Sequence, residues 1–350
     1  MITASPGARI TIPTLPPLAD WRQLWRDAIT DAHELLGLLG LEHLAGTLPA
    51  ADAGFALRVP RGFVARMRHG DGRDPLLLQV LPQLDELRHV SGFGLDAVDD
   101  MGARVARGVL HKYSGRALLI ASGSCAINCR YCFRRHFAYA ADVAAARQWA
   151  DALEYLRGNP AVNELILSGG DPLALATAKL AELSQGLADI THVTRMRIHS
   201  RLPIVVPERI DAPFLAWLDA LPQQKVVVLH ANHANEFDAS VDAACARLRA
   251  CGATLLNQSV LLRGINDNAD ALANLSERMF AAGVLPYYLH QLDRVHGTAH
   301  FEVSDAAAHK LMGDLRARLP GYLVPRLVRE LAGEPSKRPL WPAATSPGSP

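Results

Sequence analysis

The stretch Ala117-Leu-Leu-Ile-Ala-Ser-Gly-Ser-Cys-Ala-Ile-Asn-Cys-Arg-Tyr-Cys132 decides the fold. It opens with an apolar run, Ala117 to Ala121, and passes directly into a polar turn that carries three cysteines in the spacing CxxxCxxC. A short apolar run bounded by turn residues is typical of a buried strand. The sequence therefore predicts that Cys125, Cys129 and Cys132 lie in the loop that follows a strand.

The same pattern repeats downstream of about residue 105, where short apolar runs alternate with longer amphipathic stretches. Such alternation is typical of βα units and a parallel sheet. Six strands are predicted, at Ala117 to Ala121, Glu164 to Ser168, Arg195 to His199, Lys225 to His230, Thr254 to Ser259 and Val284 to Leu289. Helices are predicted between them at Ala144 to Leu156, Ala176 to Leu187, Glu236 to Ala250 and Ala271 to Ala281. We therefore predict an α/β fold whose core is a parallel barrel or partial barrel.

The two ends of the chain differ from this core. Upstream of about residue 105, apolar side chains recur near helical spacing without a repeated strand pattern, as at Trp21, Leu24, Trp25, Ile29, Leu35, Leu36 and Leu39. We predict a mainly helical region over residues 1–105, with the boundary placed to within about four residues. Residues 342–350 are rich in Pro, Gly and Ser, which predicts a flexible tail.

Composition and charge exclude several classes of protein. Lys and Arg number 36 against 35 Asp and Glu, so the formal net charge of +1 gives no electrostatic reason to bind nucleic acid or an anionic membrane. No apolar run approaches the ~20 residues of a membrane helix. The first residues also lack the charged, apolar and small-residue segments of a secretory signal. A cytoplasmic protein is expected.

Polar or glycine-rich clusters follow nearly every predicted strand. They are Ser122-Gly-Ser-Cys125, Ser168-Gly-Gly-Asp171, His199-Ser-Arg201, His230-Ala-Asn-His233 and Asn257-Gln-Ser259. In parallel α/β folds, ligands bind at the carboxyl ends of the strands. We therefore expect these clusters to face one common site.

The three closely spaced cysteines suit an iron–sulfur cluster better than other uses of cysteine. Three thiolates can bind three irons of a 4Fe-4S cluster and leave the fourth iron open to a ligand. A closed zinc site needs a fourth ligand, and neither Cys245 nor Cys251 belongs to a second CxxC pair. A thioredoxin-like site needs only CxxC near a helix N-terminus. The odd total of five cysteines also argues against a disulfide framework.

This loop, with Tyr131 before the last cysteine, resembles the cluster loop of the radical S-adenosylmethionine superfamily. From about Val109 to Leu340, further stretches resemble the lysine 2,3-aminomutase family: Cys132-Phe-Arg-Arg-His-Phe137, Arg197-Ile-His-Ser-Arg-Leu-Pro203, His230-Ala-Asn-His-Ala-Asn-Glu236, Asn257-Gln-Ser259 and Pro286-Tyr-Tyr288. Essentially the whole chain is similar to the short branch of that family, which acts in β-lysylation of elongation factor P. The stretches that carry this similarity are Leu110-His-Lys-Tyr113, Tyr287-Tyr-Leu-His290 and Gly333-Glu-Pro-Ser-Lys-Arg-Pro339.

The resemblance implies a fold, an activity and a set of cofactors. The fold is a radical S-adenosylmethionine partial (β/α)6 barrel over residues 106–325, followed by a segment, 326–341, that carries the lysine for pyridoxal phosphate. The activity is L-lysine 2,3-aminomutase, an isomerase that makes β-lysine with a 4Fe-4S cluster, S-adenosyl-L-methionine and pyridoxal 5′-phosphate. It also implies functional links to elongation factor P and its lysyl ligase, and an electron donor such as flavodoxin or ferredoxin.

The resemblance further assigns cofactor residues. Lys337 stands where the family keeps the lysine that binds pyridoxal phosphate, with Lys225 and Lys112 as rival lysines. Composition alone would treat Lys337 as a surface residue. The other residues assigned to cofactors by the resemblance are Tyr113, Arg116, Ser168, Gly169, Gly170 and Asp171. His230 and Gln258 are expected to line the S-adenosylmethionine pocket because they lie at strand ends, where buried His and Gln are as often structural hydrogen-bonding groups. The cluster ligands are Cys125, Cys129 and Cys132.

Three residues are assigned to the substrate. Arg134 resembles the arginine that binds the substrate carboxylate, to which a guanidinium fork is suited geometrically. Asp293 and Glu330 occupy the two acidic positions that receive the distal ammonium of lysine, since a buried ammonium without a partner is costly. Free-lysine aminomutases carry Asp at the second position, so Glu330 is a departure that leaves the depth of the substrate pocket open.

Two alternative functions stay open on the sequence. One is an aminomutase acting on arginine or glutamate, although two acidic residues argue against an acidic substrate side chain. The other is an iron–sulfur electron carrier without turnover of its own, which would not need Lys337. The sequence does not fix the oligomeric state and is compatible with a homo-oligomer.

Overall fold

One mixed sheet organises the computed structural model, which describes residues 20–50, 54–139, 143–147 and 149–340. The sheet has ten strands in chain order: β1 (Arg104–Ala106), β2 (Val109–Tyr113), β3 (Arg116–Ser122), β4 (Glu164–Gly169), β5 (Arg195–Ser200), β6 (Gln224–Leu229), β7 (Thr254–Val260), β8 (Leu285–His290), β9 (Arg326–Arg329) and β10 (Arg338–Pro339). The six predicted strands are β3 to β8, each correct to within one residue at either end.

The strands from β3 to β9 pair in parallel, and β1, β2 and β10 add antiparallel edges. Within the described chain, β1 and β10 end the sheet without pairing to each other, so it curves as an open barrel. The predicted partial α/β barrel is confirmed, but it has more strands than the six expected. The additional strands were missed because β2 and β9 carry polar side chains such as Lys112 and Arg329 instead of a continuous apolar run.

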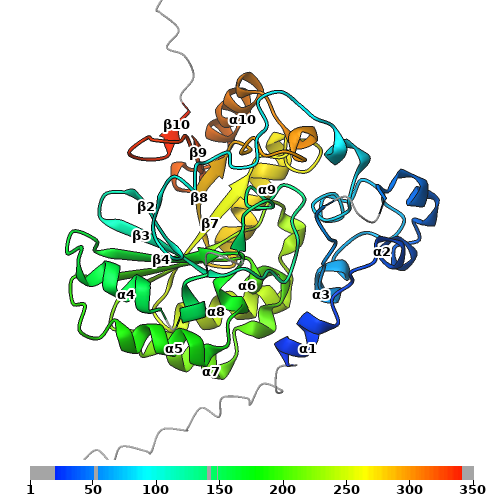
Figure 1. Cartoon of the computed structure of the whole chain (residues 1–350). Coiled ribbons are helices and arrows are strands. Elements are labelled where there is room, and N and C mark those ends of the chain that lie inside the picture. The colour runs from blue at the N-terminus through cyan, green and yellow to red at the C-terminus, as the bar shows by residue number, and fades with distance from the viewer. Residues whose placement is uncertain (1–19, 51–53, 140–142, 148, 341–350) are drawn as a thin grey trace, which may run out of the picture.

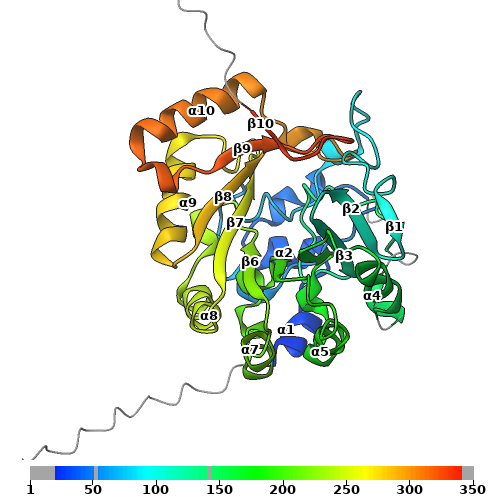
Figure 2. The same ribbon diagram turned by 90° about the vertical axis from the view of Figure 1, so that its left-hand side faces the viewer.

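Helices of the barrel lie along the convex side of the sheet (Figure 2). They are α4 (Ala150–Arg157), α5 (Thr177–Gly186), α6 (Leu202–Val205), α7 (Ala212–Asp219), α8 (Ala239–Ala250), α9 (Ala269–Ala281) and α10 (Asp305–Arg318). Short 3-10 helices connect them: η4 (Ala144–Arg147), η5 (Pro172–Ala174), η6 (Pro207–Arg209), η7 (Ala234–Glu236), η8 (Ala299–Phe301) and η9 (Gly321–Leu323). Helices α8, α9 and α10 begin after Asp238, Asn268 and Ser304, whose side chains accept backbone hydrogen bonds from the first turn.

Two helix predictions need correction. The helix expected over Ala144 to Leu156 is divided into η4 and α4, because Trp149 adopts a left-handed backbone with φ of 67° between them. Helix α8 begins at Ala239, later than the predicted Glu236, because η7 occupies residues 234–236. Helices α7 and α10 were not predicted.

The N-terminal region is partly helical and lies to one side of the sheet (Figure 1). It contains α1 (Trp21–Arg26), η1 (Glu42–Thr47), α2 (Ala32–Leu38), α3 (Arg61–Val64) and η2 (Leu84–Leu87), joined largely by turns. Its buried side chains, among them Leu35 and Phe63, belong to the same hydrophobic core as Leu119 and Leu165 of the barrel. The division at residue 105 stays a prediction, and residues 342–350 lie outside the described chain.

None of the helices in the described chain has the length and apolar character needed to cross a membrane.

Candidate active site

Side chains from β2 to β8 and from the C-terminal segment enclose a cavity of about 440 Å³. Nine of the predicted site residues line it: Tyr113, Arg116, Arg134, Ser168, His230, Gln258, Asp293, Glu330 and Lys337. The other predicted residues, Gly169, Gly170, Asp171 and the three cysteines, are outside this lining. The expectation that strand-end clusters face a common site therefore holds for β4, β5, β6 and β7.

A chain of alternating charges crosses one wall of the cavity. Lys337 is ion-paired with Oε2 of Glu330, and Oε1 of Glu330 lies 3.1 Å from Nζ of Lys112. Lys112 lies 2.7 Å from Oδ1 of Asp100, whose Oδ2 accepts a 2.6 Å hydrogen bond from Nε of Arg134. Each charged group in this series lies next to a group of opposite charge, which compensates for the free-energy cost of burying it.

Glu330 and Asp100, the two carboxylates in this series of ion pairs, are held in the ionised form. Burial by itself would raise the pKa of Glu330, but the ammonium groups of Lys337 and Lys112 outweigh burial and lower the pKa to about 2. Burial likewise opposes ionisation of Asp100, while Arg134 and Lys112 bring its pKa below the usual range. Both groups therefore carry a negative charge at neutral pH.

Asp293 is the acidic group in the cavity without such close compensation. Burial raises its pKa to about 7, and the repulsion of Glu330 adds to this effect while Lys337 opposes it. At neutral pH the carboxyl is close to its midpoint. An incoming cation would shift Asp293 fully to the carboxylate, so the site favours a positively charged group beside it.

Arg134 is fixed by three contacts. Besides the bond to Asp100, its Nη1 donates to Oγ of Ser168 at 3.1 Å and to the carbonyl oxygen of Gly169 at 3.4 Å. Its Nη2 has no hydrogen-bond partner among the described residues. The guanidinium is 7% exposed and is held in one orientation, with a donor left for an anionic group.

The glycine-rich turn after β4 packs against the cysteine loop. Gly169 has φ of 120°, and a Cβ there would lie 2.5 Å from the carbonyl oxygen of Ser122. A Cβ on Gly170 would lie 2.6 Å from the carbonyl oxygen of Ser124. Backbone N–H groups of Gly170 and Asp171 donate to these same two carbonyl oxygens. The glycines are thus required for close contact between the two loops.

The carboxylate of Asp171 is bound by the protein itself. It accepts hydrogen bonds from Oγ of Ser200 and from the backbone N–H groups of Leu173, Arg201 and Leu202. Burial nevertheless raises its pKa to about 6, with these bonds acting in the opposite direction. Asp171 joins the end of β4 to the end of β5. Its carboxylate is occupied by these bonds, so it can influence a cofactor only by holding the glycine-rich turn in place.

Three histidines line the cavity: His199 of β5, His230 directly after β6, and His290 of β8, of which His290 is buried and the other two are partly buried. Burial lowers the pKa of His230 to about 4, and it lowers the pKa of His199 and His290 as well. All three are therefore neutral near pH 7 and act as hydrogen-bonding groups. Nε2 of His199 and Oε1 of Gln258 are buried without a partner in the described chain, which indicates a polar ligand in the cavity.

Arg116 and Tyr113 face the cavity, whereas Lys225 does not reach it. The guanidinium of Arg116 lies 4.5 Å above the centroid of the Tyr113 ring, so both face the cavity from β2 and β3. Lys225 donates to the carbonyl oxygens of Asp219 and Cys251 and does not line the cavity. Of the rival lysines, Lys112 and Lys337 remain.

Cys125, Cys129 and Cys132 are free and partly buried in the loop after β3. Burial raises the pKa of Cys125, and burial raises that of Cys132 to about 11, with the neighbouring cysteines adding to both shifts. No group of three His, Cys, Asp or Glu side chains in the described chain stands in a metal-binding arrangement. The thiols nevertheless lie close enough to influence one another electrostatically.

Proteins of known function resemble this chain over nearly its full length. The L-lysine 2,3-aminomutase of Escherichia coli (strain K12) is 50% identical over 335 residues, covering 95% of this chain and 98% of that protein. The L-lysine 2,3-aminomutase of Haemophilus influenzae is 43% identical over 93% of this chain and 96% of that protein. That of Clostridium subterminale is 31% identical over 92% of this chain and 78% of that protein.

The chain belongs to the L-lysine 2,3-aminomutase family. It is an isomerase, and the radical S-adenosylmethionine enzymes of this family use a 4Fe-4S cluster, S-adenosylmethionine and pyridoxal phosphate. The family recognised in the sequence is confirmed.

Two other comparisons complete the findings. No protein-family model matches the chain. Among solved structures, a radical SAM methyltransferase from Sphaerobacter thermophilus covers 63% of this aminomutase and 68% of its own chain, with a TM-score of 0.47 and 16% identity. Streptococcus suis SuiB covers 63% of this chain and 50% of its own, with a TM-score of 0.45 and 12% identity.

The residues of this aminomutase fit the family's cofactors by their chemistry. Three thiols in one loop provide a sulfur donor set for a cluster. Lys112 and Arg116 bring positive charge to the cavity, which suits a phosphate, and the unpaired atoms of His199 and Gln258 call for a polar ligand.

Sequence reasoning missed several residues that the structure places in the cavity, among them Asp100, His199 and His290. Asp100 links Lys112 to Arg134, yet it stands in a charged turn far upstream with no motif of its own. His199 had a signal, since it belongs to the polar cluster at the end of β5, but it was not assigned a role.

Proposed function

We propose that this chain is a pyridoxal-phosphate-dependent L-lysine 2,3-aminomutase that acts in the cytoplasm and converts lysine to β-lysine in the barrel cavity. The observation that carries the proposal is that Lys337 lines the same cavity as Asp293 and is ion-paired with Glu330. A lysine from the C-terminal segment is brought to the same space as the strand-end residues. A protein that only carried electrons would have no use for this arrangement.

The proposed substrate contacts follow from charge. Arg134 offers its free guanidinium nitrogen to the substrate carboxylate, in the orientation fixed by Asp100 and Ser168. Asp293 and Glu330 supply negative charge for the distal ammonium of lysine. A glutamate substrate would bring a second negative charge to the same acidic groups, which disfavours it.

The proposed cofactor contacts divide the cavity. Lys337 would hold pyridoxal phosphate, Tyr113 would contact its ring, and Arg116 and Lys112 would bind its phosphate, since all four line the cavity. Cys125, Cys129 and Cys132 bind the cluster, and the Ser168–Asp171 turn, His230 and Gln258 form the S-adenosylmethionine site. When bound, these groups supply a radical that removes a hydrogen and a ring that allows an amino group to migrate.

The protein residues bind, orient and exclude water. Arg134 and Asp293 hold the two ends of lysine, which limits the part of the substrate exposed to a radical. The apolar lining, which includes Leu118, Ile166 and Leu256, keeps water from the reacting carbons. The neutral histidines donate or accept hydrogen bonds without adding a charge that would repel the substrate ammonium.

A substrate panel tests this proposal. Anaerobically reconstituted protein with a reductant is given lysine, arginine or glutamate, and the products are separated by chromatography with mass detection. The proposal expects β-lysine from lysine and at most trace product from the others. Turnover of arginine or glutamate in preference to lysine would contradict the substrate assignment, and no turnover with a full cluster and bound pyridoxal phosphate would contradict the aminomutase proposal.

The proposed use of β-lysine is modification of elongation factor P by a separate ligase, with flavodoxin or ferredoxin as the electron donor. The support is the similarity of Leu110-His-Lys-Tyr113 and Gly333-Glu-Pro-Ser-Lys-Arg-Pro339 to the short branch of the family. In cells that lack this enzyme, the intact mass of elongation factor P should lose a β-lysyl group, and added β-lysine should restore it. An unchanged mass would contradict this destination.

A further inference from the structure

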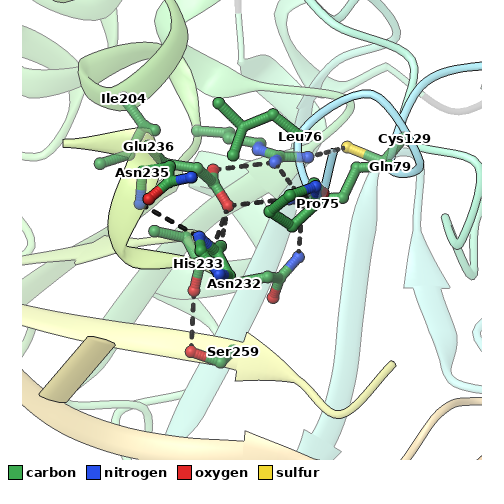
Figure 3. A network of polar contacts seen from close by, with 12 residues as sticks. Pro75, Leu76, Gln79, Cys129, Ile204, Asn232, His233, Asn235, Glu236 and Ser259 are labelled. Atoms are coloured by element: carbon green, nitrogen blue, oxygen red, sulfur yellow. Dashed lines mark hydrogen bonds and ion pairs between the residues drawn. The ribbon is translucent and has the colours of Figure 1, made fainter. Parts of the chain in front are cut away.

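A buried polar network lies behind the cysteine loop and joins four distant parts of the chain. Figure 3 shows Gln79 of the N-terminal region, Cys129 of the loop, and Asn232 and Glu236 beyond β6 directed toward one another. Arg201, directly after β5, stands at the centre of their hydrogen bonds. Gln79, Cys129, Arg201, Asn232 and Glu236 are not among the residues that line the cavity.

Arg201 contacts the cysteine loop through Nη1 and contacts Gln79 and Glu236 through Nη2. Nη1 lies 2.7 Å from Sγ of Cys129 and 2.7 Å from the hydroxyl of Tyr131. Nη2 donates to Oε1 of Gln79 at 2.6 Å and to Oε2 of Glu236 at 2.9 Å. The backbone N–H of Arg201 is fixed by Asp171 at 2.8 Å.

The carboxylate of Glu236 is held in one orientation by its own hydrogen bonds. It is 0% exposed, and its Oε1 accepts hydrogen bonds from the backbone N–H groups of Asn232 and His233 and from Nε2 of Gln79. Asn232 in turn donates to the hydroxyl of Tyr131 at 2.7 Å. A guanidinium held through Nη2 by a carboxylate and an amide keeps Nη1 directed at the sulfur and at the hydroxyl of Tyr131, while Nε has no partner in the described chain.

We propose that Arg201 is a positioning residue that donates an N–H···S hydrogen bond to the Cys129 ligand of the cluster and so raises the reduction potential of the cluster. The inference rests on the proposed function, which makes Cys129 a cluster ligand. Hydrogen bonds to ligand sulfurs and nearby positive charge are among the factors that set cluster potentials. One electron from a flavodoxin- or ferredoxin-type carrier adds negative charge to the cluster, and Arg201 stabilises that reduced state.

The test measures midpoint potential by redox titration followed with electron paramagnetic resonance, on the full-length reconstituted enzyme. Arg201→Gln alone would leave Glu236 buried without its cation, which is strongly destabilising. The double variant Arg201→Gln/Glu236→Gln removes both charges together. The matched variant Glu236→Gln keeps the guanidinium at Cys129 and removes the carboxylate that partly neutralises it.

The two variants should shift the potential in opposite directions. With wild-type iron content, the double variant should have a more negative midpoint potential, and Glu236→Gln a more positive one. A purely structural network would change cluster content without this pair of opposite shifts. A double variant with full iron and the wild-type potential would overturn the inference.

Failure of the proposed function gives a different result. If wild-type protein binds no cluster at the three cysteines, the proposed function fails before any potential is measured. If only the double variant loses its cluster, Glu236→Gln decides: a more positive potential supports the role of Arg201, and an unchanged or more negative one overturns it.

Discussion

Asp100 and Arg134 form a buried ion pair at the edge of the cavity, with 2.6 Å between Oδ2 and Nε. The other carboxylate oxygen of Asp100 lies 2.7 Å from Nζ of Lys112. One acidic residue from the N-terminal region thus orients both a proposed substrate-binding group and a proposed phosphate-binding group. This arrangement makes the N-terminal region part of the proposed active site.

Asp100→Asn should impair lysine binding and stability together. The amide leaves Arg134 without a charged partner and Lys112 with Glu330 alone, which costs about 3 kcal/mol of folding free energy. The KM for lysine should rise roughly tenfold because Arg134 loses its fixed orientation. Asp85→Asn, at an exposed pair with Arg88, is the control and should melt as wild type. A normal KM for Asp100→Asn would contradict the role assigned to this pair.

Glu330 should be sensitive to both length and charge. Its two oxygens contact Lys112 and Lys337, and Glu330→Asp is too short to keep both contacts, so kcat/KM for lysine should fall about tenfold. Glu330→Gln keeps the length of the side chain but removes its charge, and it should lower kcat/KM about a hundredfold. Steady-state kinetics of the two variants checks this order.

Glu334→Gln is the matched control, because Glu334 pairs with Arg338 and does not line the cavity. It should keep kcat/KM within a factor of about two of wild type. Equal losses of kcat/KM in Glu334→Gln and Glu330→Gln would show that activity depends on the C-terminal segment as a whole and not on the carboxylate of Glu330.

Asp293 should give the reaction a pH dependence. Burial raises its pKa to about 7, so below that pH the carboxyl is protonated and loses its attraction for the substrate ammonium. We expect kcat/KM for lysine to rise as pH increases through about 7. Asp293→Asn should lower kcat/KM and abolish this rise, whereas Asp314→Asn, at an exposed pair with Lys310, should retain it.

The same carboxyl should affect stability with the opposite dependence on pH. The folded protein holds this proton to a higher pH than the unfolded chain, so the stability that the protonated group contributes is lost as pH rises toward 7. Asp293→Asn should therefore melt above wild type at a pH of about 8. A lower melting temperature under these conditions would contradict the burial cost assigned to Asp293.

Iron content should separate the cysteine loop from the other cysteines. Cys129→Ala should lose most of the roughly four irons per chain expected for a reconstituted cluster. Cys251→Ala should retain them, because Cys251 follows α8 on the outside of the barrel, near the carbonyl oxygen of Leu215. Comparable iron in both variants would show that the cluster is bound elsewhere.

Most of the strands that build the barrel were predictable because they are short apolar runs, as in β3 and β4, whereas β5 alternates buried residues with partly buried ones. The runs that became β3 to β8 alternate with helices and end in polar clusters, so even their shared face could be inferred. Strands β2 and β9 escaped because the charged, largely buried side chains of Lys112 and Arg329 interrupt their apolar pattern. Edge strands owe their existence to pairing with a neighbour, which local sequence does not encode.

The site was predictable only where strand ends or family resemblance marked it. Lys337 lies in a Pro-containing segment that would ordinarily be surface, and only the resemblance singled it out. Asp100 and Arg201 depend on contacts across long sequence separations, with Arg134 and with Cys129 respectively. Such contacts follow from the fold of the whole chain, so no local motif announces them.

The measurement that tests the central claim most directly is the location of pyridoxal phosphate on the reconstituted enzyme. Borohydride reduction followed by peptide mapping fixes the cofactor to the lysine that binds it. The account predicts a label on Lys337 in wild type and loss of that label in Lys337→Ala, with the cluster intact in both. Label on Lys112 or Lys225, or a full cluster with no labelled lysine, would contradict it.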